Sequence, residues 1–283
     1  MRDLVIIGAG FTGTAAAVAA RSRGLDVIVL RSASAPSASS VSAGLYRPSW
    51  YGDAPPALRP SIDWLDHRAE TELVTRTYGP DAGATVRGSI ETVNVELVLR
   101  RARPVTCDVV RIDLEPSYVE IRGRTIRHRA RALLIAGGVW TDELLRLAGL
   151  REIGVKPLFG RALHIARPVR DVDEILTLAY SPYAHVTSRP LNEYVRRIGD
   201  TVERRPSDDH LVKLRRRAAA LHPAGFASTL AVGGNRPVLT GGARAGLPAP
   251  RVAYATGGAR IGLGLAWPLA EAALHLLDPW TRP

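Results

Sequence analysis

Cysteine is almost absent from this chain, which excludes the sites that need several of them. Cys107 is the only cysteine among 283 residues, so there can be no intrachain disulfide and no zinc or iron–sulfur group held by a set of cysteines. Cys107 lies in the apolar stretch 105–110, which favours a buried structural thiol over a nucleophile. The seven histidines form no close ligand pair and no H-E-x-x-H motif, so we predict no metal.

Long apolar runs are also missing. No uninterrupted apolar stretch reaches the ~18 residues of a membrane-spanning helix, so we expect no membrane partner. The first apolar run follows almost directly on Met1 and leaves no room for a signal peptide, so we expect a cytoplasmic protein. A hydrophobic fraction of 46% with 23% charged residues is ordinary for a globular enzyme, and the length allows one or two domains.

Lysine is scarce, although the net charge is +11. It occurs only at positions 156 and 213, and the remaining basic residues are arginines scattered along the chain. The excess of alanine, glycine, proline and arginine indicates a biased genome composition, which raises arginine without a functional cause. We therefore predict no nucleic-acid partner. An acidic carrier protein that delivers a tethered substrate stays open as an alternative.

A βαβ pattern opens the chain. Residues 4–7 form an apolar, β-branched run, residues 14–23 are the small residues of a helix that Gly24 ends, and residues 25–30 predict a second buried strand. The segment between the first strand and the helix, residues 8–13, reads G-x-G-x-x-G. Strand, glycine turn, helix and strand arrive in the order of a dinucleotide-binding unit, so we predict such a site.

The three glycines of this turn have separate roles. Gly8 allows a tight turn off the strand, Gly10 lets a pyrophosphate approach the backbone, and Gly13 lets the helix pack closely on the sheet. The free N–H groups at the helix start then face the anion, where the helix dipole also favours negative charge.

The residue after the second strand departs from this pattern. The fingerprint expects Asp or Glu there to bind a ribose hydroxyl, but the chain has Arg31 followed by Ser32. Arginine at this place fits the 2′-phosphate of NADP, so an NADP-dependent reductase stays open. The alternative is that Arg31 points to solvent or packs over an adenine ring.

Apolar periodicity and turn residues predict the remaining elements. A loop at 32–48 is rich in small hydroxyl residues and glycine, and its apolar residues indicate that it is packed. Helices are predicted at 61–74, 93–101, from 141 onward, 207–221, and after the glycines at 257–264 up to about 277. Strands are predicted at 105–114, as a hairpin of 118–121 and 125–128, and at 131–136, 155–166, 175–186, 193–198 and 252–256.

Five segments, in this order, resemble the D-amino-acid oxidase and glycine oxidase group of FAD enzymes. They are the glycine turn 8–13, the loop 39–48, Gly137-Gly138 followed by Trp140, the pair Arg236-Pro237, and the glycine-rich helix start 257–264. The fold implied is α/β (α+β), with a Rossmann-like FAD-binding domain and an inserted, mainly antiparallel β-sheet substrate domain. We expect the FAD-binding domain at 1–55, 92–150 and 232–283, and the substrate domain at 56–91 and 151–231.

The resemblance also assigns cofactor-binding residues. It implies non-covalent FAD, because no second cysteine is present for the covalent attachment known in some sarcosine-oxidising relatives. The expected FAD contacts are Gly8, Ala9, Gly10, Phe11, Thr12, Gly13, Leu30, Arg31, Ser32, Ser39, Ser40, Val41, Ala43, Gly44, Leu45, Val109, Ala136, Gly137, Gly138, Trp140, Gly257, Gly258, Ala259, Arg260, Ile261, Gly262, Leu263 and Gly264.

The reaction implied is oxidation of a carbon–nitrogen bond in a small D-amino acid, glycine or N-alkyl glycine. Hydride passes to the flavin, an imine forms, and O2 reoxidises the flavin to give H2O2. Arg236 would clamp the substrate carboxylate through its planar fork, with Tyr180 or Tyr183 orienting or covering the substrate. A carrier-tethered or biosynthetic amine substrate, a flavin-binding subunit without independent activity, and a homo-oligomer stay open; the short middle region motivates the second.

Overall fold

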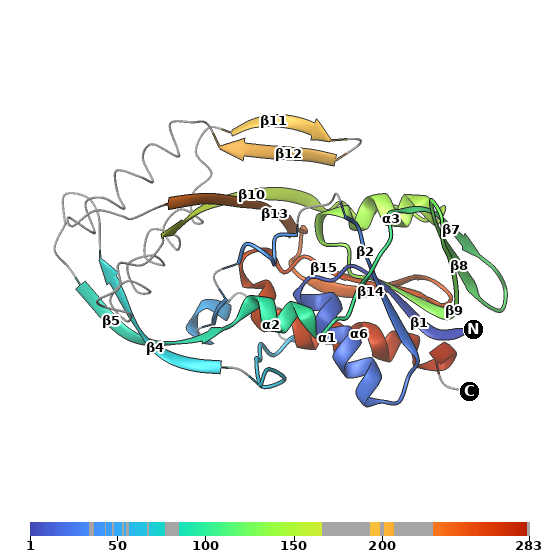
Figure 1. The fold of residues 1–283 in the computed structure, drawn as a ribbon, viewed down its shortest axis with the longest axis horizontal. Coiled ribbons are helices and arrows are strands. Elements are labelled where there is room, and N and C mark those ends of the chain that lie inside the picture. Colours follow the sequence, from blue (N-terminus) through green and yellow to red (C-terminus); the bar gives the residue numbers. More distant parts are fainter. Residues whose placement is uncertain are drawn as a thin grey trace.

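The fold was analysed in a computed structural model, which describes residues 1–33, 37–42, 44–46, 48–52, 54, 57–66, 68–76, 85–165, 193–198, 201–206 and 229–281. The central feature of this described part is an eight-stranded sheet with the order β14-β15-β9-β1-β2-β6, extended by β8 beside β9 and by β7 beside β8 (Figure 1). Its strands are β1 (Arg2–Ile7), β2 (Val27–Arg31), β6 (Val105–Thr106), β7 (Val109–Leu114), β8 (Val119–Gly123), β9 (Arg127–Ile135), β14 (Arg244–Ala249) and β15 (Val252–Thr256).

The middle of this sheet is parallel and buried on both faces. β1 pairs in parallel with β2 and β9, and β9 pairs in parallel with β15. The buried face that includes Leu4 and Ile6 packs with helices α1 (Phe11–Ser22) and α6 (Gly262–Thr281). The opposite face, with Val5, packs with the β7–β8 hairpin and α3 (Thr141–Leu147). Burial on both faces explains the continuous apolar run of β1.

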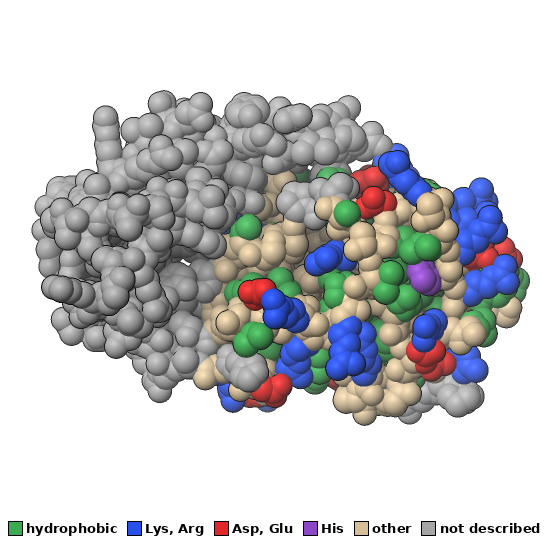
Figure 2. Space-filling model, in the orientation of Figure 1, with side chains coloured by type: hydrophobic (Ala, Val, Ile, Leu, Met, Phe, Trp, Pro, Cys, Tyr) green, Lys and Arg blue, Asp and Glu red, His purple; other side chains and the backbone are tan. Residues whose placement is uncertain are grey.

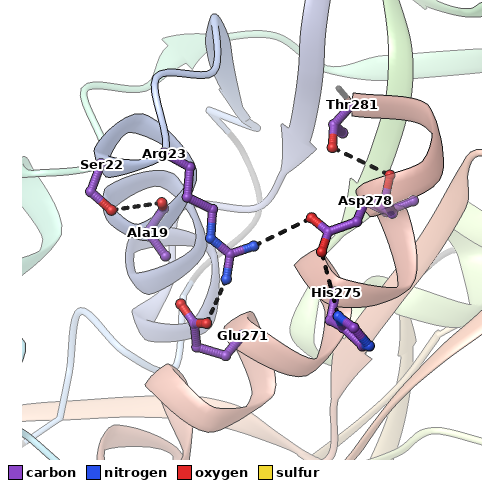
Figure 3. Close-up of polar contacts among 8 residues, drawn as sticks. Ala19, Ser22, Arg23, Glu271, His275, Asp278 and Thr281 are labelled. Carbon is purple, nitrogen blue, oxygen red and sulfur yellow. Dashed lines mark hydrogen bonds and ion pairs between the residues drawn. The ribbon is translucent and has the colours of Figure 1, made fainter. Parts of the chain in front are cut away.

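Alanine lets the two long helices lie close together. The buried face of α1 is mostly alanine, and it meets the alanine-containing face of α6 in one core cluster. An ion-pair group closes the far end of this contact (Figure 3). Arg23 pairs with Glu271 at 2.5 Å and with Asp278 at 3.7 Å, and Asp278 also lies 3.4 Å from His275. These ion pairs join the C-terminal end of α1 to the second half of α6.

Three smaller antiparallel sheets complete the described part. Their strands are β3 (Leu45–Tyr46), β4 (Arg68–Arg76) and β5 (Thr85–Val93) in the order β3-β5-β4, then β10 (Lys156–Ile165) with β13 (Thr229–Val238), and β11 (Glu193–Ile198) with β12 (Thr201–Pro206). In Figure 1, β10 and β13 lie between the β11–β12 hairpin and the large sheet. β13 contacts the short turns η2 (Gly138–Trp140) and η3 (Ala259–Ile261), which follow β9 and β15.

Short connections are fixed by single polar side chains. Helix α2 (Val95–Arg100) begins where the Asn94 side chain accepts the Leu97 amide at 3.1 Å. The Asp142 carboxylate accepts the amides of Ile153, Gly154 and Val155 at 2.8, 3.1 and 2.7 Å, and so fixes the loop that leads into β10. The turn η1 (Pro48–Tyr51) follows β3.

One predicted helix is wrong. Residues 61–74 were expected to be helical, but residues 61–66 are in turns and bends, and Arg68–Arg76 form β4, paired antiparallel with β5 along its length. The β-branched residues within 71–75 favour a strand, and pairing with β5 decides between the two periods.

Several strand boundaries also differ from expectation. The strand predicted at 105–114 is split between β6 and β7 at Cys107 and Asp108. The hairpin strand 125–128 and the strand 131–136 form one element, β9, which pairs with β8 at its start and with β1 and β15 further on. Strands β3, β5, β12, β13 and β14 were not predicted. The elements expected at 175–186 and 207–221 lie outside the described residues.

The remaining predictions agree with the structure to within a few residues. They include the βαβ opening, helix 93–101, the strands at 155–166, 193–198 and 252–256, and the C-terminal helix. The α/β class with an additional antiparallel layer is confirmed. In the ranges that the structure describes, no helix is long and apolar enough to cross a bilayer. Figure 2, in the orientation of Figure 1, shows basic side chains dispersed over the described part of the surface in view, with acidic side chains among them.

Candidate cofactor and substrate site

The N-terminal glycine turn is packed against backbone. Gly8 has φ +117°, a conformation that favours glycine, and a Cβ there would lie 2.1 Å from the Ala136 carbonyl oxygen. A Cβ on Gly13 would lie 1.9 Å from the Gly8 carbonyl oxygen. These two glycines therefore allow β1, α1 and the end of β9 to meet at one point.

The start of α1 is suited to an anion. The first amides of a helix have no intrahelical acceptor, and the first such bond here runs from Thr14 N to Gly10 O at 2.9 Å. Gly10, at the N-cap, supplies no side-chain cap, and the first turn has no acidic residue. Amides and a helix dipole without a competing carboxylate fit a pyrophosphate group.

A serine-rich loop covers this helix start. Phe11 N donates to Ser39 Oγ at 3.1 Å, and Ser39 N donates to Ser37 Oγ at 3.2 Å. The loop ends at Gly44, where φ is +69° and a Cβ would lie 2.3 Å from the Val93 carbonyl oxygen. The loop is therefore held at both ends, as its apolar residues predicted. Ala43 lies outside the described residues, and for Leu45 only the backbone is described.

The second glycine segment joins the third. A Cβ on Gly137 would meet Leu144 Cδ1 at 2.6 Å, which lets α3 begin directly after β9. Gly138 has φ +60°, and its carbonyl oxygen accepts the hydroxyls of Thr141 at 2.8 Å and Thr256 at 3.1 Å. The second of these bonds links the turn after β9 to the end of β15. Two turns predicted to contact FAD are therefore neighbours.

The third segment leads from β15 into α6. Gly257 has φ +89°, and a Cβ on Gly258 would lie 2.8 Å from Gly262 Cα. The Gly264 amide donates to the Tyr51 hydroxyl at 3.1 Å, and the Tyr51 ring lies where a Gly264 Cβ would be, at 2.5 Å. Burial raises the pKa of the Tyr51 phenol. Gly264 thus has a packing role beside the cofactor role expected of it.

Strand β13, which carries Arg236, contacts the turns after β9 and β15. Gly234 faces the serine-rich loop, since a Cβ on it would lie 3.0 Å from Ala38 Cα and 3.0 Å from Val41 Cγ2. Residues two apart on a strand share a face, so Arg236 is on this side of β13 as well. Asn235, between them, is buried. Tyr180 and Tyr183, the other residues assigned to the substrate, lie outside the described residues.

The end of β2 carries the residues expected at the adenosine. Leu30 is fully buried and Arg31 is exposed. Ser32 Oγ donates to Asp108 Oδ1 at 2.5 Å, and Val109, which follows, is half-buried at the start of β7. The chain therefore has an arginine and an aspartate at this edge of the sheet.

Sequence reasoning missed three residues that shape the site. Tyr51 caps α6, Thr256 links two turns, and Asp108 lies beside Ser32. Each acts on a partner far along the chain, so no local pattern identifies it. For Asp108 the sequence held only a weak indication. It is an acidic residue within the stretch 105–114, which was predicted to be one continuous strand.

Comparisons with known proteins agree with this geometry. The model of the family described as FAD dependent oxidoreductase matches residues 3–105 and 101–276. Comparison with curated protein sequences gives no match.

Three solved structures share the fold of this chain. Iminodiacetate oxidase from Chelativorans sp. BNC1 has a TM-score of 0.66 at 16% identity, over 98% of this chain and 94% of that one. Glycine oxidase from Geobacillus kaustophilus has a TM-score of 0.65 at 16% identity, over 98% of this chain and 95% of that one. L-amino acid deaminase from Proteus vulgaris, with its specific insertion sequence deleted, has a TM-score of 0.67 at 14% identity, over 99% of this chain and 90% of that one. The family match spans most of the sequence, so the chain belongs to the FAD dependent oxidoreductase family, and FAD is its cofactor.

Proposed function

We propose that the protein oxidises the carbon–nitrogen bond of a small amino acid or amine that carries a carboxylate. The observation that supports this most is the position of Arg236, on the face of β13 that meets the serine-rich loop. The same strand contacts η2 and η3, the turns expected to hold FAD. A guanidinium at this place can grip a carboxylate by two parallel hydrogen bonds.

The residues of the chain divide the work between cofactor and substrate. When bound, FAD supplies the hydride acceptor. The amides at the start of α1 would hold its pyrophosphate without covalent attachment, and the amides at the start of α6 would stabilise negative charge on the pyrimidine side of the ring. Arg236 would fix the substrate by its carboxylate, with Tyr180 or Tyr183 covering it, so that the C–H bond faces the flavin.

Two further points belong to the proposal. The substrate gives an imine, and O2 accepts the electrons to give H2O2. The chain divides into the FAD-binding domain (1–55, 92–150 and 232–283) and the substrate domain (56–91 and 151–231). The names iminodiacetate oxidase and glycine oxidase, given to proteins of the same fold, support a substrate with both nitrogen and carboxylate.

Arg236→Ala tests the substrate class. It should keep FAD but lose a charge-assisted pair, with a cost on the order of 2–5 kcal/mol in kcat/KM for amino-acid substrates. Arg236→Lys should recover part of this, because an ammonium lacks the bidentate fork. Anaerobic flavin bleaching with small D-amino acids, glycine and N-methylglycine measures both variants. Arg244→Ala, at an exposed arginine, is the matched control.

The opposite outcome would redirect the proposal. If Arg236→Ala reduces its flavin as fast as the unmodified protein with the best substrate found, the substrate carboxylate is absent or is bound elsewhere. An amine without a carboxylate, or a carrier-tethered substrate, would then replace the amino acid.

A further inference from the structure

Asp108 lies at the edge of the sheet where dinucleotides bind. β2 and β6 are parallel neighbours, with Leu30 beside Val105 and Arg31 beside Thr106. Cys107 N continues this ladder by donating to Arg31 O at 2.9 Å. Asp108 therefore emerges one residue beyond the ladder, at the carboxyl end of β2. Ligands of open parallel sheets bind outside these carboxyl ends.

The Asp108 carboxylate is positioned but keeps acceptor capacity. Ser32 Oγ donates to Oδ1 at 2.5 Å, and this bond holds the side chain beside the residue that follows β2. Asp108 is half-buried, and among the described residues it forms no ion pair with an arginine, lysine or histidine. A carboxylate accepts about four hydrogen bonds, so one serine leaves most of its capacity unused.

The residue that usually does this work is missing from β2. The fingerprint places an acid at the end of the second strand to accept a ribose hydroxyl, and here that position is the exposed Arg31. We propose that Asp108, in the connection that follows the adjacent strand β6, takes the place of that acid and accepts the 2′-hydroxyl of the adenosine ribose of FAD. The inference rests on FAD binding at the glycine turn 8–13.

The same carboxylate explains how an arginine can stand at this position without selecting a 2′-phosphate. Arg31 alone would attract the dianionic phosphate of an NADP-type nucleotide. Asp108 is bonded to Ser32, the residue that follows Arg31, and a carboxylate at this place repels the negative charge of a 2′-phosphate. Asp108 therefore acts as the selectivity residue, favouring a free ribose hydroxyl over a phosphorylated one.

The test measures binding rather than turnover. Apoprotein is titrated with FAD by flavin fluorescence, and ADP, 2′-deoxy-ADP and 2′-phospho-ADP are then used as competitors. The unmodified protein should prefer ADP to both analogues, and to 2′-deoxy-ADP on the order of tenfold, as expected for a hydrogen bond to a charged group. Asp108→Ala should weaken FAD by a similar factor and remove the preference over 2′-deoxy-ADP. Asp108→Asn should bring 2′-phospho-ADP closer to ADP.

The controls separate this proposal from its premise. Asp26→Asn removes a carboxylate just before β2, at the opposite end of that strand, and should change none of these affinities. Gly10→Val should abolish binding of FAD and of every competitor. Failure of the unmodified protein to bind FAD would reject the cofactor site itself. Normal FAD binding with equal affinity for ADP and 2′-deoxy-ADP, or with Asp108→Ala unchanged, would overturn the role of Asp108 alone.

Discussion

The two glycine turns at the starts of α1 and α6 look alike in sequence but are built differently. At Gly8 and Gly13 of the first turn, the space that a side chain would need is taken by backbone, the carbonyls of Ala136 and Gly8. At Gly264 of the second turn, this space is taken by the ring of Tyr51, whose hydroxyl also accepts a hydrogen bond from the Gly264 amide. The first turn is thus determined within and beside its own strand. The second depends on a residue 213 positions away.

The difference explains why one turn can be predicted and the other only in part. Backbone atoms are the same in every sequence, so close backbone packing leaves a glycine pattern that can be read directly. A side-chain partner brought by folding leaves no such pattern. Gly8 and Gly13 should therefore tolerate no added atom, while position 264 should accept one if the Tyr51 side chain is made smaller.

Gly13→Ala should give the largest loss of stability. The added Cβ would lie 1.9 Å from the Gly8 carbonyl oxygen, so α1 would have to separate from β1, at about 3 kcal/mol or more in the free energy of unfolding. Urea denaturation measures it. The control is Gly24→Ala beyond the other end of α1, where φ is +81° but nothing lies within 4 Å; it should cost only about 1–2 kcal/mol. Equal losses would contradict the backbone-packing account.

Gly264→Ala should have an intermediate effect that depends on Tyr51. Overpacking against the ring should cost about 1–3 kcal/mol. Tyr51→Ala should relieve it, so the double variant should be more stable than the sum of the two single losses predicts. Additive losses in this cycle would show that the ring is not what limits residue 264.

Thr256→Val should have the smallest effect. It removes the hydroxyl that links β15 to the Gly138 carbonyl, while the Thr141 hydroxyl still satisfies that oxygen. The expected loss is about 0.5–1.5 kcal/mol, with the apolar volume of the buried site kept. The midpoint of thermal unfolding measures it, and a loss as large as that of Gly13→Ala would mean that the joint between the two turns holds the site more firmly than either glycine turn.

The features that could be predicted were local or periodic. β1 could be predicted because burial on both faces requires a continuous apolar run. The turn at 8–13 could be predicted because its close contacts with backbone require glycine. The prediction of a helix at 61–74 was wrong because the pairing of β4 with β5 overrides the helical spacing of the apolar residues. The single strand predicted at 105–114 is wrong because the chain leaves the β2–β6 ladder after Cys107, and β7 then pairs with β8.

The candidate site divides in the same way. The five predicted segments supplied the cofactor turns and Arg236, and the structure brings the described parts of these segments together. Tyr51, Thr256 and Asp108 were missed because each acts through a contact that exists only once distant strands and loops meet.

The most direct test of the central claim is the visible absorption spectrum of the purified protein. We expect the two flavin bands, release of the flavin as free FAD when the protein is denatured, and no flavin in Gly10→Val, because a side chain there blocks the approach of the pyrophosphate. A folded, colourless protein that neither quenches nor retains added FAD would contradict it.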